Sequence, residues 1–128
     1  MKKKGFTLVE LLAVITLIGI LGLITVPIIN NTIKNSRKKA FKETLNAIVD
    51  SAKIYNADTD YLVMTPENDL DVLDHNLKYE NRSEILGGSI KYNSGKYSFD
   101  FVFSKYYCAS GDIENIEIYD INSDECTE

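Results

Sequence analysis

Residues 11–33 read LLAVITLIGILGLITVPIINNTI, a run without a charged residue that consists mainly of Leu, Ile and Val. As a helix, this run would extend over about 34 Å at about 1.5 Å per residue, while the hydrocarbon core of a bilayer is about 30 Å thick. The sequence therefore predicts one membrane-spanning helix near the N-terminus. The rest of the 128-residue chain is long enough for one small domain.

Basic residues lie on both sides of this run. Residues 2–4 are three lysines, and five more basic residues follow the run: Lys34, Arg37, Lys38, Lys39 and Lys42. Because Lys and Arg flank both ends, the positive-inside rule does not choose an orientation. We expect the five residues to form a solvated face near lipid headgroups, with contact to acidic neighbouring domains and contact to DNA as the alternatives.

Three interpretations of the N-terminus compete: a secretory signal peptide, an uncleaved membrane anchor, and a short leader that is removed in front of a retained helix. A secretory signal has an apolar stretch of about 7–15 residues with small residues at a cleavage site behind it. Here the run is longer and no such site follows it. An anchor fits the length but leaves Glu10 unexplained, because a carboxylate at the edge of an apolar run carries a desolvation cost unless it is paired.

The third interpretation has a specific motif behind it. Residues 2–10, KKKGFTLVE, resemble the processing motif of type IV pilins and pseudopilins, which are class III prepilins. The resemblance implies that a prepilin peptidase cuts after Gly5 and methylates the new amine at Phe6. It also implies that Glu10 meets the Phe6 amine of a neighbouring subunit during assembly. The similarity is strong over residues 2–33 and only architectural beyond them.

The residues of the motif also suit this chemistry by themselves. Gly5 has no side chain, so an extended backbone there can enter a narrow protease cleft. Cutting at this point leaves the apolar helix on the product. An ion pair between Glu10 and a neighbouring amine would depend strongly on distance in a low-dielectric core, so it would act as a register check more than as a net source of stability. The alternative for Glu10 is a side chain that snorkels at the start of the helix.

Three residues inside the apolar run weaken a helix: Gly19, Gly22 and Pro27. Pro27 cannot donate to the carbonyl four residues back, so a kink or a local opening is expected between about residues 19 and 27. Membrane helices tolerate such residues, and small residues allow neighbouring helices to approach. The resemblance to pilins implies that this part of the helix partly melts in the filament, with a simple bend as the alternative.

An amphipathic pattern follows the basic cluster and continues the helix to about residue 57. Apolar side chains recur at helical spacing, and we expect them to pack in a core: Phe41, Leu45, Ile48, Ala52 and Tyr55. The chain then divides into a leader (1–5), a transmembrane and assembly half of the helix (6–33), an amphipathic half (34–57), and a remainder (58–128) with a loop, a sheet and a tail. Within the loop a short helix is expected where Leu70, Leu73 and Leu77 recur.

Alternation of apolar and polar residues predicts strands in the remainder. Tyr97, Phe99, Phe101 and Phe103 are expected on one face of a strand, with the residues between them on the other. Flanking strands are expected near residues 89–92, before the turn residues Asn93-Ser94-Gly95, and near residues 116–121. The predicted fold is α+β, with a long N-terminal helix packed on an antiparallel sheet of three or four strands. This arrangement is similar to that of pilins.

The two cysteines, Cys108 and Cys126, have no C-x-x-C or histidine spacing around them, which argues against zinc or a redox pair. If the domain lies outside the cytoplasm, we expect a disulfide between them. It would tie the C-terminal tail to a strand, as the family often does, and stabilise the domain by about 3 kcal/mol in the chain-entropy model.

The sequence does not predict an enzyme. It has one histidine, His75, expected to be exposed in the loop, and it lacks a phosphate-binding loop or a metal-binding motif of known spacing. The nearest approach to a calcium loop is residues 120–125, DINSDE, in which Asp120, Asn122 and Asp124 alternate but the usual glycine is missing. Some pseudopilins bind calcium in a C-terminal loop, so these three residues are candidate ligands, with a plain acidic tail as the alternative.

Charge and resemblance together indicate the partners. The net charge is −5, and −8 once the lysines of residues 2–4 are removed, so a nucleic-acid-binding surface is not favoured. The resemblance implies a filament of identical subunits and other pilins, a prepilin peptidase, an inner-membrane assembly platform and membrane lipid. The chain would span the cell membrane once, with an extracytoplasmic C-terminal domain, and then enter a cell-surface, periplasmic or cell-wall filament.

Several functions stay open at this point. The filament could serve adhesion or motility, DNA uptake in competence, or secretion of the type II kind. The alternative from a different class is a monomeric, single-pass, membrane-anchored binding module outside the cytoplasm.

Overall fold

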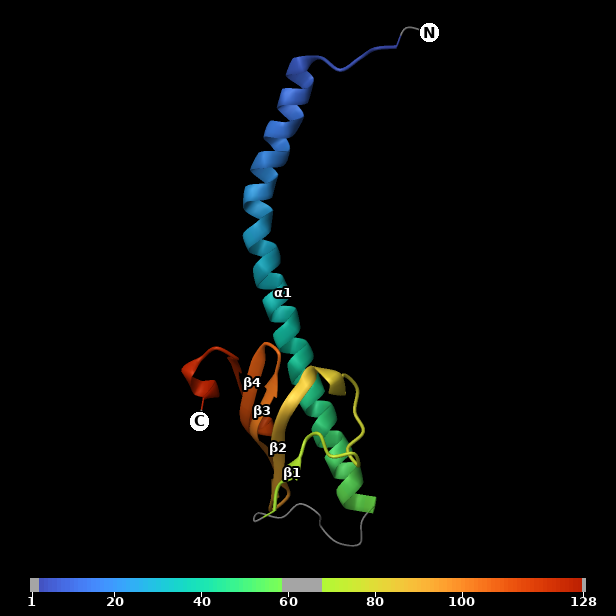
Figure 1. Cartoon of the computed structure of the whole chain (residues 1–128), viewed down its shortest axis with the longest axis vertical. Helices are drawn as coiled ribbons and strands as arrows, with labels where there is room; N and C mark the ends of the chain where they lie inside the picture. The colour runs from blue at the N-terminus through green and yellow to red at the C-terminus, as the bar shows by residue number, and fades with distance from the viewer. Residues whose placement is uncertain (1–2, 59–67, 128) are drawn as a thin grey trace. The chain divides into compact units, whose positions relative to one another are not determined.

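A computed structural model describes residues 3–58 and 68–127, and the chain divides into two compact units, Met1–Arg37 and Lys38–Glu128. We call the second unit the head. The elements follow in the order α1 (Leu8–Asp58), β1 (Leu70–Asp71), η1 (Arg82–Glu84), β2 (Ile85–Asn93), β3 (Lys96–Ser104), β4 (Tyr107–Asp112), η2 (Ile113–Asn115), β5 (Glu117–Asp120) and η3 (Asp124–Cys126) (Figure 1).

The five strands form one antiparallel sheet in the order β1-β2-β3-β4-β5, so that each strand pairs with its neighbours in the chain. This confirms the predicted α+β class with a long N-terminal helix. The sheet has five strands where three or four were expected.

The core of the head lies between one face of the sheet and the part of α1 that belongs to this unit. The predicted apolar stripe is buried at Phe41, Leu45, Ile48 and Ala52, and Tyr55 packs against it while partly exposed. The sheet and the loop contribute the remaining buried apolar side chains: Val72, Leu77, Ile85, Ile90, Tyr97, Phe99, Val102, Tyr107 and Ala109. Most of the stability of α1 in the head therefore comes from this packing.

The hairpin between β2 and β3 has the turn that its sequence predicts. Asn93 pairs with Lys96, which leaves Ser94 and Gly95 as the two loop residues. Both have positive φ angles, 51° and 88°, as a two-residue type I′ turn requires. Such a turn matches the right-handed twist of the strands and fixes their register.

The single aromatic face expected for β3 is wrong after Phe99. Tyr97 and Phe99 are buried, but beyond them the buried residues are Val102 and Ser104, while Phe101 and Phe103 are partly exposed. The register of β3 against β4 shifts between Phe99 and Val102, and Phe101 has a φ of 43°. A bulge inserts one extra residue into the strand, so every side chain after it changes face.

The short helix expected near Leu70, Leu73 and Leu77 is also wrong. Leu70 lies in β1, and the following residues form turns. The Leu73 N–H donates to the Asp71 carboxylate at 2.8 Å, and the Asn76 N–H donates to the Asp74 carboxylate at 2.8 Å. Aspartate side chains that bond the backbone two residues ahead compete with helical hydrogen bonds. The Asn76 N–H also lowers the pKa of Asp74.

Arg82 holds this loop in place. Its guanidinium donates to the carbonyl oxygens of Asp74 at 2.9 Å and Leu77 at 2.6 Å, and it also donates to the carbonyl of Leu73. The planar guanidinium has five donors and can satisfy several carbonyls at once, which a lysine cannot do in this geometry. The loop is joined to α1 by a hydrogen bond of 2.8 Å from the Lys78 N–H to the Ser51 hydroxyl.

The predicted disulfide is confirmed. Cys108 in β4 is bonded to Cys126 in η3, with their Cα atoms 5.9 Å apart and a sequence separation of 18 residues. It ties the segment that contains β5 and η3 to β4, the strand beside β5 in the sheet.

Reduction of this bond should lower the free energy of unfolding of the full chain in detergent by about 3 kcal/mol, because the reduced chain regains loop entropy when it unfolds. Urea unfolding followed by tyrosine fluorescence can measure this, since the chain has eight tyrosines and no tryptophan. A variant with both cysteines changed to serine is the control and should not respond to reductant. Equal stability of the oxidised and reduced wild type would contradict the expectation.

Candidate processing and assembly site

The residues before α1, from Lys3 to Thr7, have no regular secondary structure and are exposed. A Cβ added at Gly5 would meet no atom within 4 Å, and the φ of Gly5 lies outside the left-handed region. The fold itself therefore gives no steric reason for glycine at this position. This fits a requirement that comes from another molecule, such as a protease that must bind the backbone closely.

The first turn of α1 is closed by a reciprocal pair of hydrogen bonds between Thr7 and Glu10. The Thr7 N–H donates to Oε2 of Glu10 at 2.9 Å, and the Glu10 N–H donates to the hydroxyl of Thr7 at 3.2 Å. The carbonyl of Thr7 accepts the first helical bond from Leu11 at 3.2 Å. This is a capping box, in which two backbone donors at the start of a helix are satisfied by each other's side chains.

The roles predicted for the N-terminal motif did not include Thr7. The signal was present, because residues 7–10 read T-L-V-E and fit the pattern of a capping box before an apolar run. The cap uses Oε2 of Glu10, which leaves Oε1 for a second donor. Glu10 can thus hold the start of its own helix and still face the amine of another chain.

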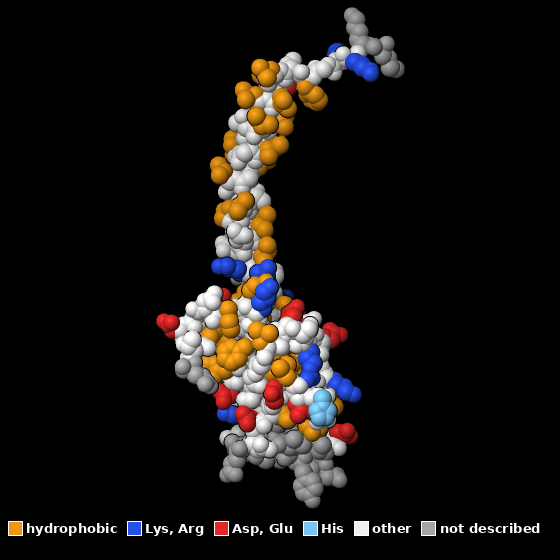
Figure 2. Space-filling model, viewed as in Figure 1, with side chains coloured by type: hydrophobic (Ala, Val, Ile, Leu, Met, Phe, Trp, Pro, Cys, Tyr) orange, Lys and Arg blue, Asp and Glu red, His pale blue; other side chains and the backbone are white. Residues whose placement is uncertain are grey.

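The half of α1 that follows has an apolar surface that nothing in the described chain covers. The exposed large apolar side chains run from Phe6 to Ile33, and in the described residues beyond them only Ile54, Leu86 and Tyr106 are of this kind. Figure 2 shows these side chains in orange along the helix. α1 is long and apolar enough to cross a membrane. Such a surface is stable in lipid or against other apolar helices.

The polar side chains within this half are adapted to an apolar environment. The hydroxyls of Thr16, Thr25 and Thr32 donate to the carbonyls of Leu12, Leu21 and Ile28, each four residues back, at 2.7, 2.6 and 2.9 Å. A hydroxyl without a partner would be costly in hydrocarbon. Because the helix satisfies these groups itself, they do not oppose insertion.

Gly19, Gly22 and Pro27 lie inside α1, which is helical without a break from Leu8 to Asp58 in this single chain. A Cβ at either glycine would meet no atom within 4 Å. Glycine costs about 1 kcal/mol relative to alanine in a helix, and no contact with the described residues explains that cost. Close approach of a second helix would explain it. The opening of the helix at this point concerns the filament and stays a prediction.

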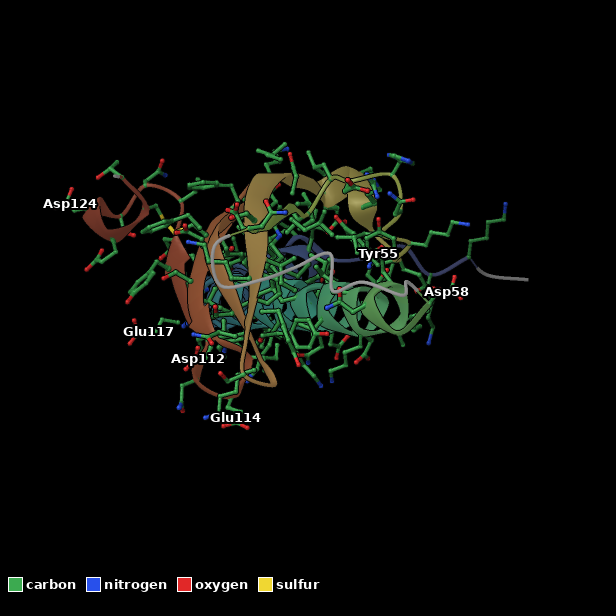
Figure 3. The ribbon with its side chains drawn as sticks, turned by 90° about the horizontal axis from the view of Figure 1, so that it is seen from below. Tyr55, Asp58, Asp112, Glu114, Glu117 and Asp124 are labelled. Carbon is green, nitrogen blue, oxygen red and sulfur yellow. A yellow bond between two sulfur atoms is a disulfide. The ribbon has the colours of Figure 1, made fainter. Side chains whose placement is uncertain are left out.

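The candidate calcium ligands follow one another along the C-terminal segment, and calcium binding by them stays a prediction. Asp120 ends β5, Asn122 lies in the following turn and Asp124 begins η3. Figure 3 shows Asp124 apart from Asp112, Glu114 and Glu117. In residues 3–58 and 68–127, no group of three or more acidic, histidine or cysteine side chains is placed to hold a metal ion.

His75, the single histidine, is exposed as predicted, with its ring 3.7 Å from the carboxylate of Asp74.

A basic, exposed segment before an uncovered apolar helix is the arrangement expected of a protein that is anchored in a membrane by its N-terminus. Residues 1–26 match the prokaryotic N-terminal methylation motif. This match supports the type IV pilin and pseudopilin family, and with it a pilin-like precursor that a prepilin peptidase processes. No curated protein and no solved structure matches the chain significantly.

Proposed function

We propose that the chain is a structural subunit of a type IV pilus or pseudopilus, polymerised through the N-terminal half of α1. The observation that carries the proposal is the methylation motif directly before an apolar helix whose surface is uncovered. A helix that only anchored a soluble domain would not need a cleavable basic leader in front of it. In the proposed pathway the peptidase cuts after Gly5, methylates Phe6 and leaves the helix on the mature subunit.

The mature helix needs an apolar environment both in the membrane and in the filament. Before assembly the apolar side chains from Phe6 to Ile33 contact lipid, and in the filament they contact the same helices of other copies. Because both environments are apolar, extraction by an assembly platform in the inner membrane does not expose the helix to water. The head would stay outside the cytoplasm in both states.

Glu10 is proposed to give the assembly its register. After cleavage the chain begins at Phe6, one residue before Thr7, the N-cap of α1. A carboxylate in a bundle of apolar helices is costly unless a positive group meets it, and the new amine of a neighbouring copy is such a group. Subunits out of register would leave both charges unpaired.

The proposal covers filaments for adhesion or motility, for DNA uptake and for secretion, since they share this mode of assembly. A direct DNA contact of the head is not favoured by the negative charge of the chain. The exposed basic residues at 34–42 suit a position near lipid headgroups.

Mass spectrometry of the protein from its native membrane tests the proposal. The expected N-terminus is N-methylated Phe6, and Gly5→Val should leave the full-length precursor in the membrane. A wild-type protein that keeps Met1 would instead indicate a monomeric anchored binding module. Loss of residues 6–30 from the mature protein would overturn the proposal, because the assembly helix would be gone.

A further inference from the structure

The face of the sheet that is turned away from α1 carries an apolar patch. It consists of Phe101 and Phe103 on β3, Leu86 on β2 and Tyr106 in the turn between β3 and β4, and we call it the aromatic patch. The two phenylalanine rings stack with centroids 6.2 Å apart and an angle of 15° between their planes. Leu86 is 65% exposed, next to Gly87, the register partner of Phe103. Figure 2 shows that orange side chains gather on the visible face of the head.

A strained backbone produces this patch. Phe101 has a φ of 43°, a conformation that costs about 1–3 kcal/mol for a residue with a bulky side chain. The bulge turns Phe101 and Phe103 out of the core and puts Val102 into it. Phe101 and Phe103 stay partly exposed and belong neither to the core cluster nor to the side chains packed on it. This indicates that they contact a partner.

A second exposed apolar position lies on the opposite side of the head. Ile54 on α1 is 70% exposed, nine residues and therefore half a rotation around the helix from the fully buried Leu45. Tyr107 stacks on Phe41 at 6.0 Å, which places the turn between β3 and β4 at the Phe41 end of the head. Ile54 is about 20 Å further along the helix. The two apolar sites thus lie on opposite faces and towards opposite ends.

The charges nearest Tyr106 and Ile54 are of opposite sign, and a further exposed carboxylate, Glu84, lies two residues before Leu86. Lys105 is the one charged residue between Phe101 and Gly111, and its amine lies 5.2 Å from the centre of the Tyr106 ring. Ile54 lies between the exposed carboxylates of Asp50 and Asp58. Lys53 forms an ion pair with Asp50 at 3.6 Å, and Figure 3 shows Asp58 at the end of α1. A contact between the two sites would bring Lys105 near a carboxylate, whereas two aromatic patches facing each other would bring two lysines together.

We propose that the aromatic patch of one copy docks on the Ile54 end of α1 in a second copy of this chain. The inference rests on the proposed function and names a contact between heads within it. A contact between two different faces is heterologous, so it propagates as an open filament wherever the rotation between successive copies does not close a ring. Patch-to-patch pairing would instead close into a dimer.

Cross-linking of the full chain in its filament tests the geometry. Leu86→Cys and Ile54→Cys are made in separate chains, which are expressed alone or together, and filaments are treated with a short bis-maleimide. The two native cysteines form the disulfide and do not react. Cross-linked dimers are expected only when both variants are present. Dimers from Leu86→Cys alone, or no dimers from the mixture, would overturn the proposed contact.

A charge placed in the patch tests its contribution to assembly. Leu86→Asp should reduce the amount of filament at least tenfold, and Ser83→Asp, which adds the same charge at an exposed position outside the patch, should not. Both variants should carry methylated Phe6. Normal filaments from Leu86→Asp would overturn the inference while the proposed function stands. A wild-type chain that is never processed would overturn both the proposed contact and the proposed function.

Discussion

Replacement of Gly88 by alanine should destabilise the head by about 3–5 kcal/mol, because it combines steric overlap in a packed core with a disfavoured backbone conformation. Gly88 has a φ of 127°, and a Cβ there would lie 2.5 Å from Cα of Val102 and 2.6 Å from the carbonyl oxygen of Phe101. Both are backbone atoms of the bulge in β3 and cannot move without breaking the pairing of β2 with β3. Urea unfolding of the full chain in detergent measures the loss.

The neighbouring residue is a matched control for this experiment. A Cβ at Gly87 would meet no atom within 4 Å, and the φ of Gly87 lies outside the left-handed region. Gly87→Ala should therefore change the free energy of unfolding by no more than about 1 kcal/mol. If the two variants were equally stable, the close approach of β2 to the bulge would not exist in solution.

The bulge also shows where prediction from the sequence stopped. Alternation from Tyr97 to Phe103 is regular, and nothing local distinguishes Phe99 from Phe101. The residue that allows the bulge at this position is Gly88. It lies on the neighbouring strand β2 and lets the backbone of β3 come close to β2. A pattern read along one strand cannot contain that information, because it arises from the pairing of two.

The helix predicted in the loop before β2 is wrong for a different reason. Leu70, Leu73 and Leu77 have helical spacing, but Asp71 and Asp74 bond the backbone two residues ahead and favour turns. These aspartates were visible in the sequence. A further contribution to the conformation of the loop comes from Arg82, which lies outside the loop and donates hydrogen bonds to its carbonyl oxygens. The helical spacing of the leucines does not produce a helix here, because the two aspartate side chains bond backbone N–H groups in turns instead.

The N-terminal helix was predictable because its signals are local and long. The uncharged residues 11–33 and the motif around Gly5 need no partner elsewhere in the chain to be recognised. Thr7 was equally local, since a threonine three residues before a glutamate at the start of an apolar run is a known cap. The same glutamate belongs to the methylation motif, so this short stretch of sequence carries two signals at once.

These two roles of Glu10 can be separated by Glu10→Gln. A glutamine amide can still accept the hydrogen bond from Thr7, so the capping box and the start of α1 should persist. The negative charge is lost, and with it the proposed partner for the Phe6 amine of a neighbouring copy. Cleavage after Gly5 and membrane retention should be normal, while filaments should fall below about one tenth of the wild-type amount, as for the loss of about 1.4 kcal/mol or more per contact.

Thr7→Val provides the opposite change, because it keeps the charge of Glu10 and removes the hydroxyl that accepts from the Glu10 N–H. Loss of an N-cap costs about 1 kcal/mol, which frays the first turn of α1 but leaves the carboxylate available to another chain. The Thr7→Val variant should assemble filaments, in smaller amounts or more slowly. For Thr7→Val and for Glu10→Gln, the measured quantity is the amount of protein in sheared filaments relative to the amount of methylated protein that remains in the membrane. If Glu10→Gln assembled normally while Thr7→Val did not, the cap would be the function of Glu10, and register would have to come from contacts between the heads.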